Sequence, residues 1–409
     1  MSGPKKRCTP RPQIRASKAQ RPAREIRWNC PVAAKCGGCQ LTRLSYAEQL
    51  QWKQQRVAEL LDGICEVRPI LGMDDPFHYR NKVQAAFYTD KKGKIISGVY
   101  QSGSHHVVGI DSCQTEDVIA DKIIVAVRKL LPSFRMTTYN EDTGKGFLRH
   151  ILVKRGFATN QIMLVLVTGT PVFPSKNNFV KAILKQFPEI TTIVQNINPY
   201  RTNLVLGDNQ KVLYGKGYIE DILCGCRFRI SPKSFYQINP VQTEVLYGKA
   251  IEFANLKGNE TVLDTYCGIG TIGIIAAKNG AGNVIGAELN GDAVRDAIVN
   301  ARANNLKNIR FYKADAGEFM REAADEDEKP DVVFMDPPRA GSDRKFLDSL
   351  IKMSPKKVVY VSCNPETLAR DLAYLTQNSP YKAQKIQPVD MFPHTAHVET
   401  IVLLQRGTL

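Results

Sequence analysis

A cysteine near the C-terminus follows a short apolar run. The segment VVYVSCNPETLARDL begins at Val358, and its pattern predicts a buried strand that stops at S-C-N-P before a helix. In α/β proteins, ligands bind at the edge of the sheet where such strands end. Cys363 is therefore a candidate nucleophile. The alternative is an inert packing thiol, the common state of a free cysteine, but the polar neighbours Ser362 and Asn364 favour a reactive position.

Carbon 5 of a pyrimidine is a poor nucleophile by itself, but a thiol and a carboxylate together can make it accept an alkyl group. Addition of a thiolate to carbon 6 gives an enolate whose carbon 5 attacks an electrophilic methyl group, and a base then removes the proton from carbon 5. Glu399, in MFPHTAHVETIVLL, is the candidate base because it follows two histidines and opens an apolar run. The alternative for Glu399 is a surface carboxylate, which the residues alone do not exclude.

Four more apolar runs end in acids that suit a nucleotide-like cofactor. VLDTYCGIGTIG contains Asp264 and glycines at 268, 270 and 273; glycine lets the backbone approach a ligand, and the next helix offers free N–H groups. Glu288 ends VIGAE, where an acid can accept ribose hydroxyls. Asp315 ends IRFYKAD, in a position to meet an exocyclic amine, and Asp336 opens DPPR. The alternatives are a nicotinamide enzyme, which would not ordinarily carry D-P-P, and a domain with incidental carboxylates.

These residues require a parallel sheet to bring them together. After about residue 228, strand-like runs alternate with helical stretches, a pattern typical of a doubly wound α/β domain. Between residues 83 and 223, short apolar runs alternate with polar turns, which predicts a strand-rich α+β domain with helices near DKIIVAVRKLL and NNFVKAILKQF. We therefore expect a basic, disordered arm over 1–29, a central RNA-binding domain with a cysteine cluster over 30–227 and a cofactor-binding domain over 228–409. Ser45 and Glu48 predict a capped helix just after a cysteine cluster.

Five segments together resemble a known family: SCNPETLARDL, DMFPHTAHVE, DPPRAG, DTYCGIGT and SFYQINP. The chain is similar to the RNA uracil-5-methyltransferases, class I enzymes that use S-adenosylmethionine. The resemblance implies that Cys363 is the nucleophile, Glu399 the base, and Phe235 a platform for the target base. It implies cofactor contacts from Gln237, Tyr266, Thr271, Glu288, Asp315 and Asp336. Arg339 follows D-P-P where enzymes that methylate exocyclic amines carry an aromatic residue, so an amine acceptor is not expected.

Three cysteines lie close together in the sequence. Cys30, Cys36 and Cys39 have the spacing C-x5-C-x2-C, which predicts a metal site in a reducing compartment. Cys113 is the preferred fourth ligand, with Cys65 and Cys8 as alternatives. Zinc and a four-iron cluster both accept four thiolates; the family resemblance implies [4Fe–4S], with zinc as the less favoured metal.

The net charge of +16 favours a polyanionic partner, and the resemblance makes that partner RNA. The 29 residues before Cys30 carry nine basic residues and one acid, and they do not show the strands of the RNA-binding barrel found in many relatives. Within the family that the chain resembles, the cysteine cluster implies 23S ribosomal RNA as the substrate, with transfer RNA as the second candidate. A non-catalytic RNA-binding protein is the alternative of another class.

The longest apolar run, IMLVLV, is too short to span a membrane. The basic N-terminal segment is not followed by the apolar region of a secretory signal. We therefore expect a cytoplasmic protein with no membrane association and no obligate protein partner.

Overall fold

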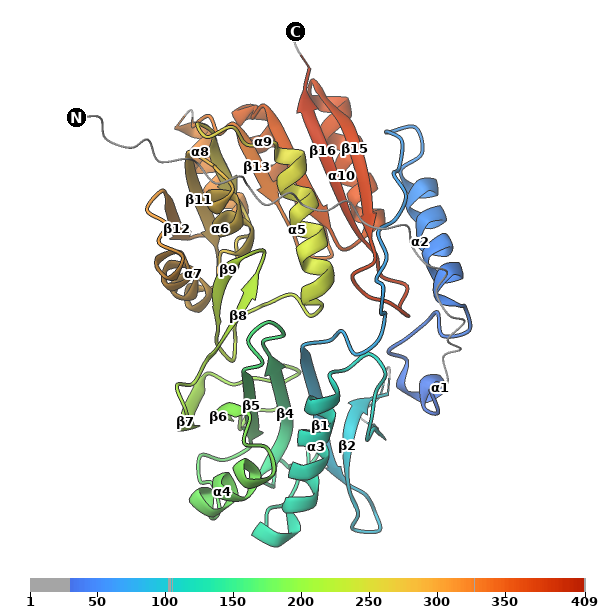
Figure 1. Ribbon diagram of the computed structural model, residues 1–409, viewed down its shortest axis with the longest axis vertical. Helices are drawn as coiled ribbons and strands as arrows, with labels where there is room; N and C mark the ends of the chain where they lie inside the picture. Colours follow the sequence, from blue (N-terminus) through green and yellow to red (C-terminus); the bar gives the residue numbers. More distant parts are fainter. Residues whose placement is uncertain (1–29, 102–103, 105, 327, 408–409) are drawn as a thin grey trace, which may run out of the picture.

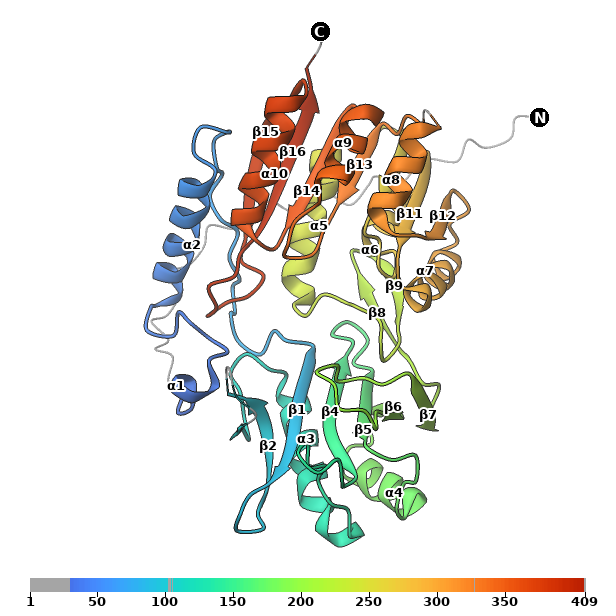
Figure 2. The same cartoon turned by 180° about the vertical axis from the view of Figure 1, so that it is seen from behind.

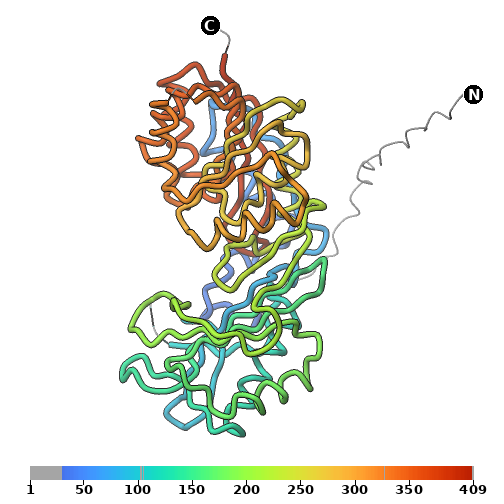
Figure 3. Tube along the Cα trace, turned by 90° about the vertical axis from the view of Figure 1, so that its left-hand side faces the viewer, coloured from blue at the N-terminus to red at the C-terminus, as the bar shows by residue number. Residues whose placement is uncertain are grey.

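The computed structural model describes residues 30–407 except 102, 103, 105 and 327. Two lobes follow one another along the long axis, each built around its own sheet (Figure 1; Figure 3). The predicted arm over residues 1–29 lies outside the described residues. In the described part of the chain, no helix combines the length and the apolar character needed to cross a membrane.

The C-terminal lobe contains a seven-stranded sheet in the order β12-β11-β10-β13-β14-β16-β15. Its first five strands are parallel, and β16 runs antiparallel to both β14 and β15. The strands are β10 (Thr261–Asp264), β11 (Asn283–Glu288), β12 (Ile309–Lys313), β13 (Val332–Met335), β14 (Lys357–Ser362), β15 (Tyr381–Val389) and β16 (Glu399–Arg406). Strand β13 is buried along its whole length, as expected for a strand covered on both faces. The predicted doubly wound sheet is confirmed.

Six helices cover the two faces of this sheet. They are α5 (Pro240–Ala254), α6 (Thr271–Lys278), α7 (Gly291–Ala303), α8 (Ala316–Asp325), α9 (Arg344–Met353) and α10 (Pro365–Asn378). Helices α5, α6 and α7 contribute Leu246, Ile274 and Ala293 to one apolar cluster, whereas α8 to α10 build a second cluster. Figures 1 and 2 show the two helical layers from opposite sides. Every connection between parallel strands therefore crosses a face, and the strand ends stay open for a site.

The N-terminal lobe is rich in strands, as predicted. Its sheet has the order β3-β2-β1-β4-β5-β6-β7, and β5–β6 is its only parallel pair of strands among the described residues. The elements are β1 (Lys82–Thr89), β2 (Ile95–Tyr100), β3 (Val107–Gly109), α3 (Val118–Leu130), the 3-10 turn Pro132–Phe134, β4 (Leu148–Arg155), β5 (Ile162–Thr168), α4 (Lys176–Gln186), β6 (Ile190–Ile197) and β7 (Asn209–Tyr214). The hairpin β8 (Ile219–Leu223) and β9 (Cys226–Ile230) leads into the C-terminal lobe.

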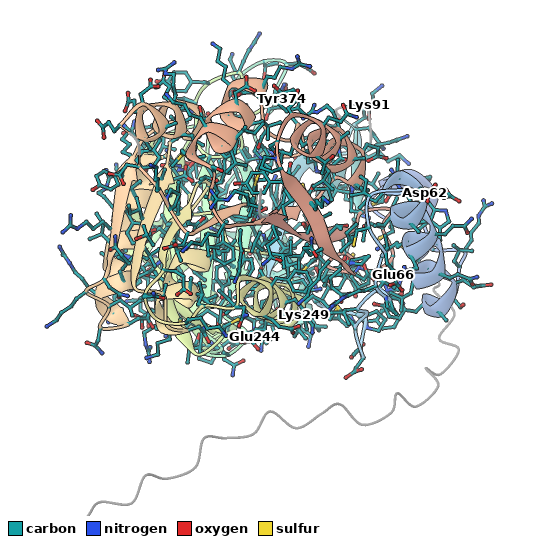
Figure 4. All side chains as sticks on the ribbon, turned by 90° about the horizontal axis from the view of Figure 1, so that it is seen from above. Asp62, Glu66, Lys91, Glu244, Lys249 and Tyr374 are labelled. Atoms are coloured by element: carbon teal, nitrogen blue, oxygen red, sulfur yellow. The ribbon has the colours of Figure 1, made fainter. Side chains whose placement is uncertain are left out.

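The first described helices are α1 (Ala33–Cys36) and α2 (Tyr46–Leu60). Ser45 caps α2 in a capping box with Glu48, which confirms the predicted helix start. The apolar side of α2 joins the core of the C-terminal lobe through Val57, and Figure 4 shows the helix standing beside the C-terminal strands. Beyond α2, Val67 and Leu71 pair in parallel with β15. Helix α2 and the segment after it therefore pack with the C-terminal sheet. The domain boundaries at residues 29/30 and 227/228 stay a prediction.

Candidate active site

A cavity of about 440 Å³ opens at the carboxyl ends of the parallel strands. Its lining comes from the ends of β10, β11, β13 and β14, the loop before α5, and the loop between β15 and β16. The residues are Phe235, Tyr236, Gln237, Tyr247, Asp264, Tyr266, Cys267, Gly268, Ile269, Thr271, Ile272, Glu288, Asp336, Pro337, Pro338, Arg339, Cys363, Phe392, His397 and Glu399. The structure therefore brings together all the predicted catalytic and cofactor residues except Asp315.

One end of the cavity is built from the loop between β10 and α6. Asp264 accepts a hydrogen bond from the Gly273 N–H at 2.8 Å, and Glu288 accepts one from the Gly268 N–H at 3.0 Å. Gly270 has φ of +83°, and a Cβ there would lie 2.8 Å from the Phe311 ring, so both the backbone and the space require glycine. The start of α6 consequently faces the cavity as a set of backbone donors.

Burial raises the pKa of Asp264 to about 7 and that of Asp336 to about 7. The second carboxylate oxygen of Asp264 is buried with no hydrogen-bond partner among the described residues. A nearby cation or hydrogen-bond donor stabilises the charged form of a carboxyl group whose pKa has been raised by burial. This end of the cavity therefore suits a ligand that brings N–H or O–H donors or a positive charge.

At the other end, strand pairing places Cys363 opposite Glu399. Strands β14 and β16 are antiparallel with Ser362 opposite Thr400, so the next positions, Cys363 and Glu399, follow at the open end of the same pair. Glu399 is 3% exposed, and its Oε2 atom has no hydrogen-bond partner in the described part of the chain. The two candidate catalytic groups thus meet because neighbouring strands end there.

Burial is the main electrostatic influence at this end of the cavity. Burial, and then the charge of Asp336, raise the pKa of Glu399 well above its ordinary value, while Arg339 opposes them. Burial, Glu399 and Asp336 raise the pKa of Cys363 to about 11, and Arg339 again opposes them. Without a ligand, the structure therefore favours a neutral thiol and a neutral carboxyl. A cation bound among these groups would favour the thiolate and the carboxylate.

Asp315 does not line the cavity. Its exposed carboxylate caps α8 by accepting hydrogen bonds from Gly317 and Glu318. Its charge still contributes to the raised pKa of Tyr266, so it lies near the cavity wall, and its role as a cofactor contact stays a prediction.

Sequence reasoning did not assign roles to Tyr247, Phe392 and His397, which also line the cavity. Tyr247 lines the cavity beside Thr271 and Gln237, two predicted cofactor residues. His397 Nε2 lies 3.4 Å from the Arg339 guanidinium, and burial together with Arg339 lowers its pKa. The H-x-E spacing was the only signal for His397, and no local pattern marks Tyr247, which is one of many buried residues on α5.

Three of the predicted metal ligands, Cys30, Cys36 and Cys113, lie within electrostatic range of the fourth, Cys39. Burial raises the pKa of Cys39 to about 12; Arg80 opposes this, and the charges of Cys113, Cys36 and Cys30 add to it. The Arg80 Nε donor is buried without a partner among the described residues, as expected where a sulfur-rich anion would sit. In the described ranges, however, no three His, Cys, Asp or Glu side chains converge in a metal-ligating arrangement. The alternative ligand Cys65 packs against the core beneath α2, and Cys8 lies outside the described residues.

Comparisons with known proteins agree with this architecture. A family model described as tRNA (uracil-5-)-methyltransferase matches residues 203–407. The chain is 44% identical over 382 residues to an uncharacterized RNA methyltransferase of Bacillus cereus, covering 92% of this chain and 82% of that protein. It is 45% identical over 379 residues to an uncharacterized RNA methyltransferase of Clostridium tetani, with the same coverage of 92% and 82%.

Among solved structures, the chain is similar to the Pyrococcus abyssi tRNA (uracil-54, C5)-methyltransferase in complex with S-adenosyl-L-homocysteine. The TM-score is 0.76 at 30% identity, covering 90% of this chain and 85% of that one. The sheet order and the cavity at its strand ends define a class I S-adenosylmethionine-dependent methyltransferase. The chain belongs to the tRNA (uracil-5-)-methyltransferase family and is an RNA methyltransferase. The expected family, fold class and enzyme class are confirmed.

Proposed function

We propose that this enzyme methylates carbon 5 of a uridine through a covalent bond between Cys363 and carbon 6 of the base. The observation that carries the proposal is the juxtaposition of Cys363 and Glu399 at the ends of β14 and β16, inside one cavity with the glycine loop after β10. A methyltransferase that acted on an amine would not need a thiol at this place. The exposed Phe235, 62% accessible at the mouth of the cavity, would stack on a base flipped out of the RNA.

Different residues of the cavity would bind the cofactor, attack the base and remove its proton. Gln237, Tyr266, Thr271, Glu288, Asp315 and Asp336 would hold S-adenosylmethionine, which supplies an electrophilic methyl group and a positive sulfonium. Cys363 as thiolate would add to carbon 6, so that carbon 5 becomes nucleophilic and takes the methyl group; the bond from that methyl group to sulfur would break, with the neutral thioether S-adenosylhomocysteine as the leaving group. Glu399 then removes the proton from carbon 5, and the bond from Cys363 to carbon 6 breaks as the ring regains its double bond.

Substitution of the two groups tests this mechanism. Cys363→Ala should abolish both methyl transfer and any RNA adduct, because no thiolate can add to the ring. Glu399→Gln should methylate the base but release it slowly, so that an RNA–protein adduct survives denaturing electrophoresis. Cys65→Ala, a change of a thiol outside the cavity, is the matched control. Methyl transfer by the Cys363→Ala variant at the wild-type rate would refute the covalent route.

For the RNA, we propose 23S ribosomal RNA. The cysteine cluster supports this substrate, because its spacing resembles that of family members that act on ribosomal RNA. The similarity to the Pyrococcus abyssi tRNA (uracil-54, C5)-methyltransferase makes transfer RNA the second candidate. Mass mapping of both RNAs from cells that lack this protein separates them. Loss of a methyl group from one 23S uridine is the expected result, and a loss confined to transfer RNA would assign the second candidate.

We propose that Cys30, Cys36, Cys39 and Cys113 hold a structural [4Fe–4S] cluster, with zinc as the alternative. The influence of Cys30, Cys36 and Cys113 on the pKa of Cys39 and the unpartnered Arg80 Nε support a sulfur-rich site among the described residues. Anaerobic protein should contain iron and sulfide and absorb broadly in the visible range, and Cys39→Ser should lose both. Cys65→Ser is the control. Colourless protein loaded with zinc would overturn the iron assignment, and metal-free protein would overturn the site.

A further inference from the structure

The loop between β15 and β16 carries residues of the cavity. Phe392 and His397 of this loop line the cavity, and Glu399 follows directly. The loop packs against α2 and the segment after it, more than three hundred positions earlier in the chain. Its internal bonds all involve Thr395: the Thr395 N–H and Oγ–H donate to the Phe392 carbonyl at 3.2 and 2.8 Å, and the His397 N–H donates to Thr395 Oγ1 at 3.3 Å, in the described part of the chain. Most of what fixes its shape therefore comes from outside the loop.

A buried ion pair holds the beginning of the loop. Lys53 of α2 donates to Asp390 at 2.6 Å and to the Phe392 carbonyl at 3.0 Å, and both members of the pair are fully buried. Tyr46, on the same helix, donates to the other Asp390 oxygen at 2.9 Å. Because a buried charge without a partner is costly, these contacts hold the lysine against the Phe392 carbonyl.

Gln49 of α2 holds the middle of the loop at two points. The His394 N–H donates to Gln49 Oε1 at 2.9 Å, and Gln49 Nε2 lies 3.2 Å from His394 Nδ1. His394 Nε2 lies 3.0 Å from the Pro76 carbonyl, which can only accept, so Nε2 carries the proton. Nδ1 is then the acceptor, and the Gln49 amide is the donor.

This double contact has a structural reason. His394 adopts φ of +71°, a left-handed conformation that is uncommon for a residue other than glycine. Two further bonds support the same stretch: Leu41 N–H donates to the His394 carbonyl, and Tyr79 O–H donates to the Pro393 carbonyl, each at 3.0 Å. Surrounding groups therefore impose the backbone path that leads to Glu399.

We propose that Gln49 and Lys53 are positioning residues for methyl transfer, which set the β15–β16 loop so that His397 and Glu399 face the bound base. The inference rests on the proposed function, because it concerns the group proposed as the base. Neither residue lines the cavity, so both act through the loop. Loss of either should impair proton removal at carbon 5 and leave cofactor binding at the opposite end of the cavity intact.

Gln49→Glu gives a pH-dependent test with a matched control. At low pH, one proton between the carboxyl introduced at position 49 and His394 Nδ1 restores a donor–acceptor pair, whereas at high pH two acceptors face each other. Lys53, Asp390, Tyr46 and Tyr79 are titratable groups beside this stretch of the described chain; they remain unchanged in the variant. The ratio of variant to wild-type kcat should therefore fall steeply as the pH rises. Gln51→Glu, on the exposed side of α2, should show a flat ratio.

Gln49→Met and Lys53→Met test the size of the effect. We expect kcat to fall about 10- to 100-fold, as a misplaced catalytic group would cause, while KM for S-adenosylmethionine changes less than about threefold and the RNA adduct accumulates. Val57→Ala weakens α2 packing without touching the loop, so it should lower Tm but keep kcat. Should Lys53→Met fail to fold, the double variant Lys53→Met with Asp390→Leu removes both charges and still lacks the donor to Phe392.

The outcomes are distinguishable. If the wild-type enzyme methylates no uridine, the proposed function fails irrespective of these variants. If the wild type is active and the Gln49 and Lys53 variants keep kcat, the positioning inference is overturned. It is also overturned if these variants lose kcat and cofactor binding together with Tm, or if Val57→Ala loses kcat to the same extent as they do.

Discussion

At the residue scale, the protonation state of Cys363 should depend on the cofactor site. Its pKa is raised to about 11 by burial, Glu399 and Asp336, so the free enzyme holds a thiol at neutral pH and its alkylation rate should increase with pH up to that value. A ligand cation at ~4–6 Å lowers such a pKa by roughly one to three units. Sinefungin, which carries an ammonium where S-adenosylmethionine carries its sulfonium, should shift the midpoint of iodoacetamide labelling downward.

S-adenosylhomocysteine is the matched ligand for that measurement, because its thioether is neutral. Quantifying the Cys363 peptide by mass spectrometry across the pH range separates this thiol from the other cysteines. Steric shielding by either ligand changes the rate at every pH, whereas only a charge moves the midpoint. An equal midpoint with both ligands would show that no cation reaches Cys363.

Glu399 should lower the stability of the folded protein at neutral and alkaline pH, although it is proposed as the catalytic base. Burial and Asp336 raise its folded-state pKa, so the unfolded chain releases this proton at lower pH than the folded chain does. The resulting penalty is absent below an ordinary carboxyl pKa of ~4.3 and grows as the pH rises toward the raised value. Glu399→Gln should therefore raise Tm at pH 8, with a smaller gain at pH 5, while kcat falls about 10²- to 10⁴-fold.

Thermal unfolding and multiple-turnover methylation of the same preparation measure both effects. Gln387, another buried residue of the C-terminal sheet, offers a comparison through Gln387→Glu, which should destabilise the fold at pH 8 by introducing a buried acid. A Tm of Glu399→Gln that is equal to or below the wild-type value at pH 8 would contradict the electrostatic explanation.

At the element scale, the loop before α5 depends on the N-terminal lobe. Lys154 of β4 donates to the Ser231 and Ser234 carbonyls at 2.9 and 2.8 Å, and Asn81 donates to the Gln237 carbonyl at 3.1 Å. Lys154→Met removes two hydrogen bonds to a loop that carries Phe235 and Gln237. Burial lowers the pKa of Lys154 to about 7, so near neutral pH the amine donates partly in its neutral form. We expect about tenfold weaker binding of S-adenosylmethionine in calorimetry, because a hydrogen bond of this kind contributes ~0.5–1.5 kcal/mol net and part of the loss is recovered by relaxation of the loop.

The control is Lys216→Met, at an exposed turn beside β7, which should bind the cofactor as the wild type does. Unaltered binding by Lys154→Met would show that the loop keeps its shape without the lysine.

The same loops show what sequence could and could not predict. Cys363, Glu399 and the glycine loop were predictable because each lies at a strand end or in a local motif, and the sheet converts those ends into one cavity. Asp315 was predicted as a cofactor contact because it ends a strand and matches the family pattern, and in the structure its carboxylate caps α8. Helix caps and cofactor contacts use the same residue types at strand ends, so type and position alone do not separate them.

The role of α2 was beyond local pattern. Its start at Ser45 follows from the capping box, but its contacts with Asp390 and His394 join residues about 340 positions apart. Gln49 and Lys53 on the buried side of α2 are polar, so their spacing resembles a solvated face. Only the tertiary structure supplies the partners that allow these groups to be buried.

At the scale of the whole molecule, charge and site are separable. Residues 1–29 carry nine basic residues and one acid, which is half of the net charge of +16, whereas the cavity is lined with carboxylates and one arginine. Long-range attraction of RNA depends on the first feature, and chemistry on the second. Replacing the nine basic residues by glutamine should weaken RNA binding but leave S-adenosylmethionine affinity and Tm unchanged.

The salt dependence of RNA binding gives the size of this effect. Each neutralised phosphate of single-stranded RNA contributes ~0.7 to the slope of log affinity against log salt, so the loss of about half of nine contacts should flatten the slope by about 3. The glutamine variant removes the charges but keeps the chain length, whereas a deletion of residues 1–29 removes both. If only charge matters, the two variants should give the same slope. An unchanged slope in the glutamine variant would mean that the remaining basic residues bind the RNA. A lower kcat at saturating RNA would mean that residues 1–29 also act after the RNA has bound.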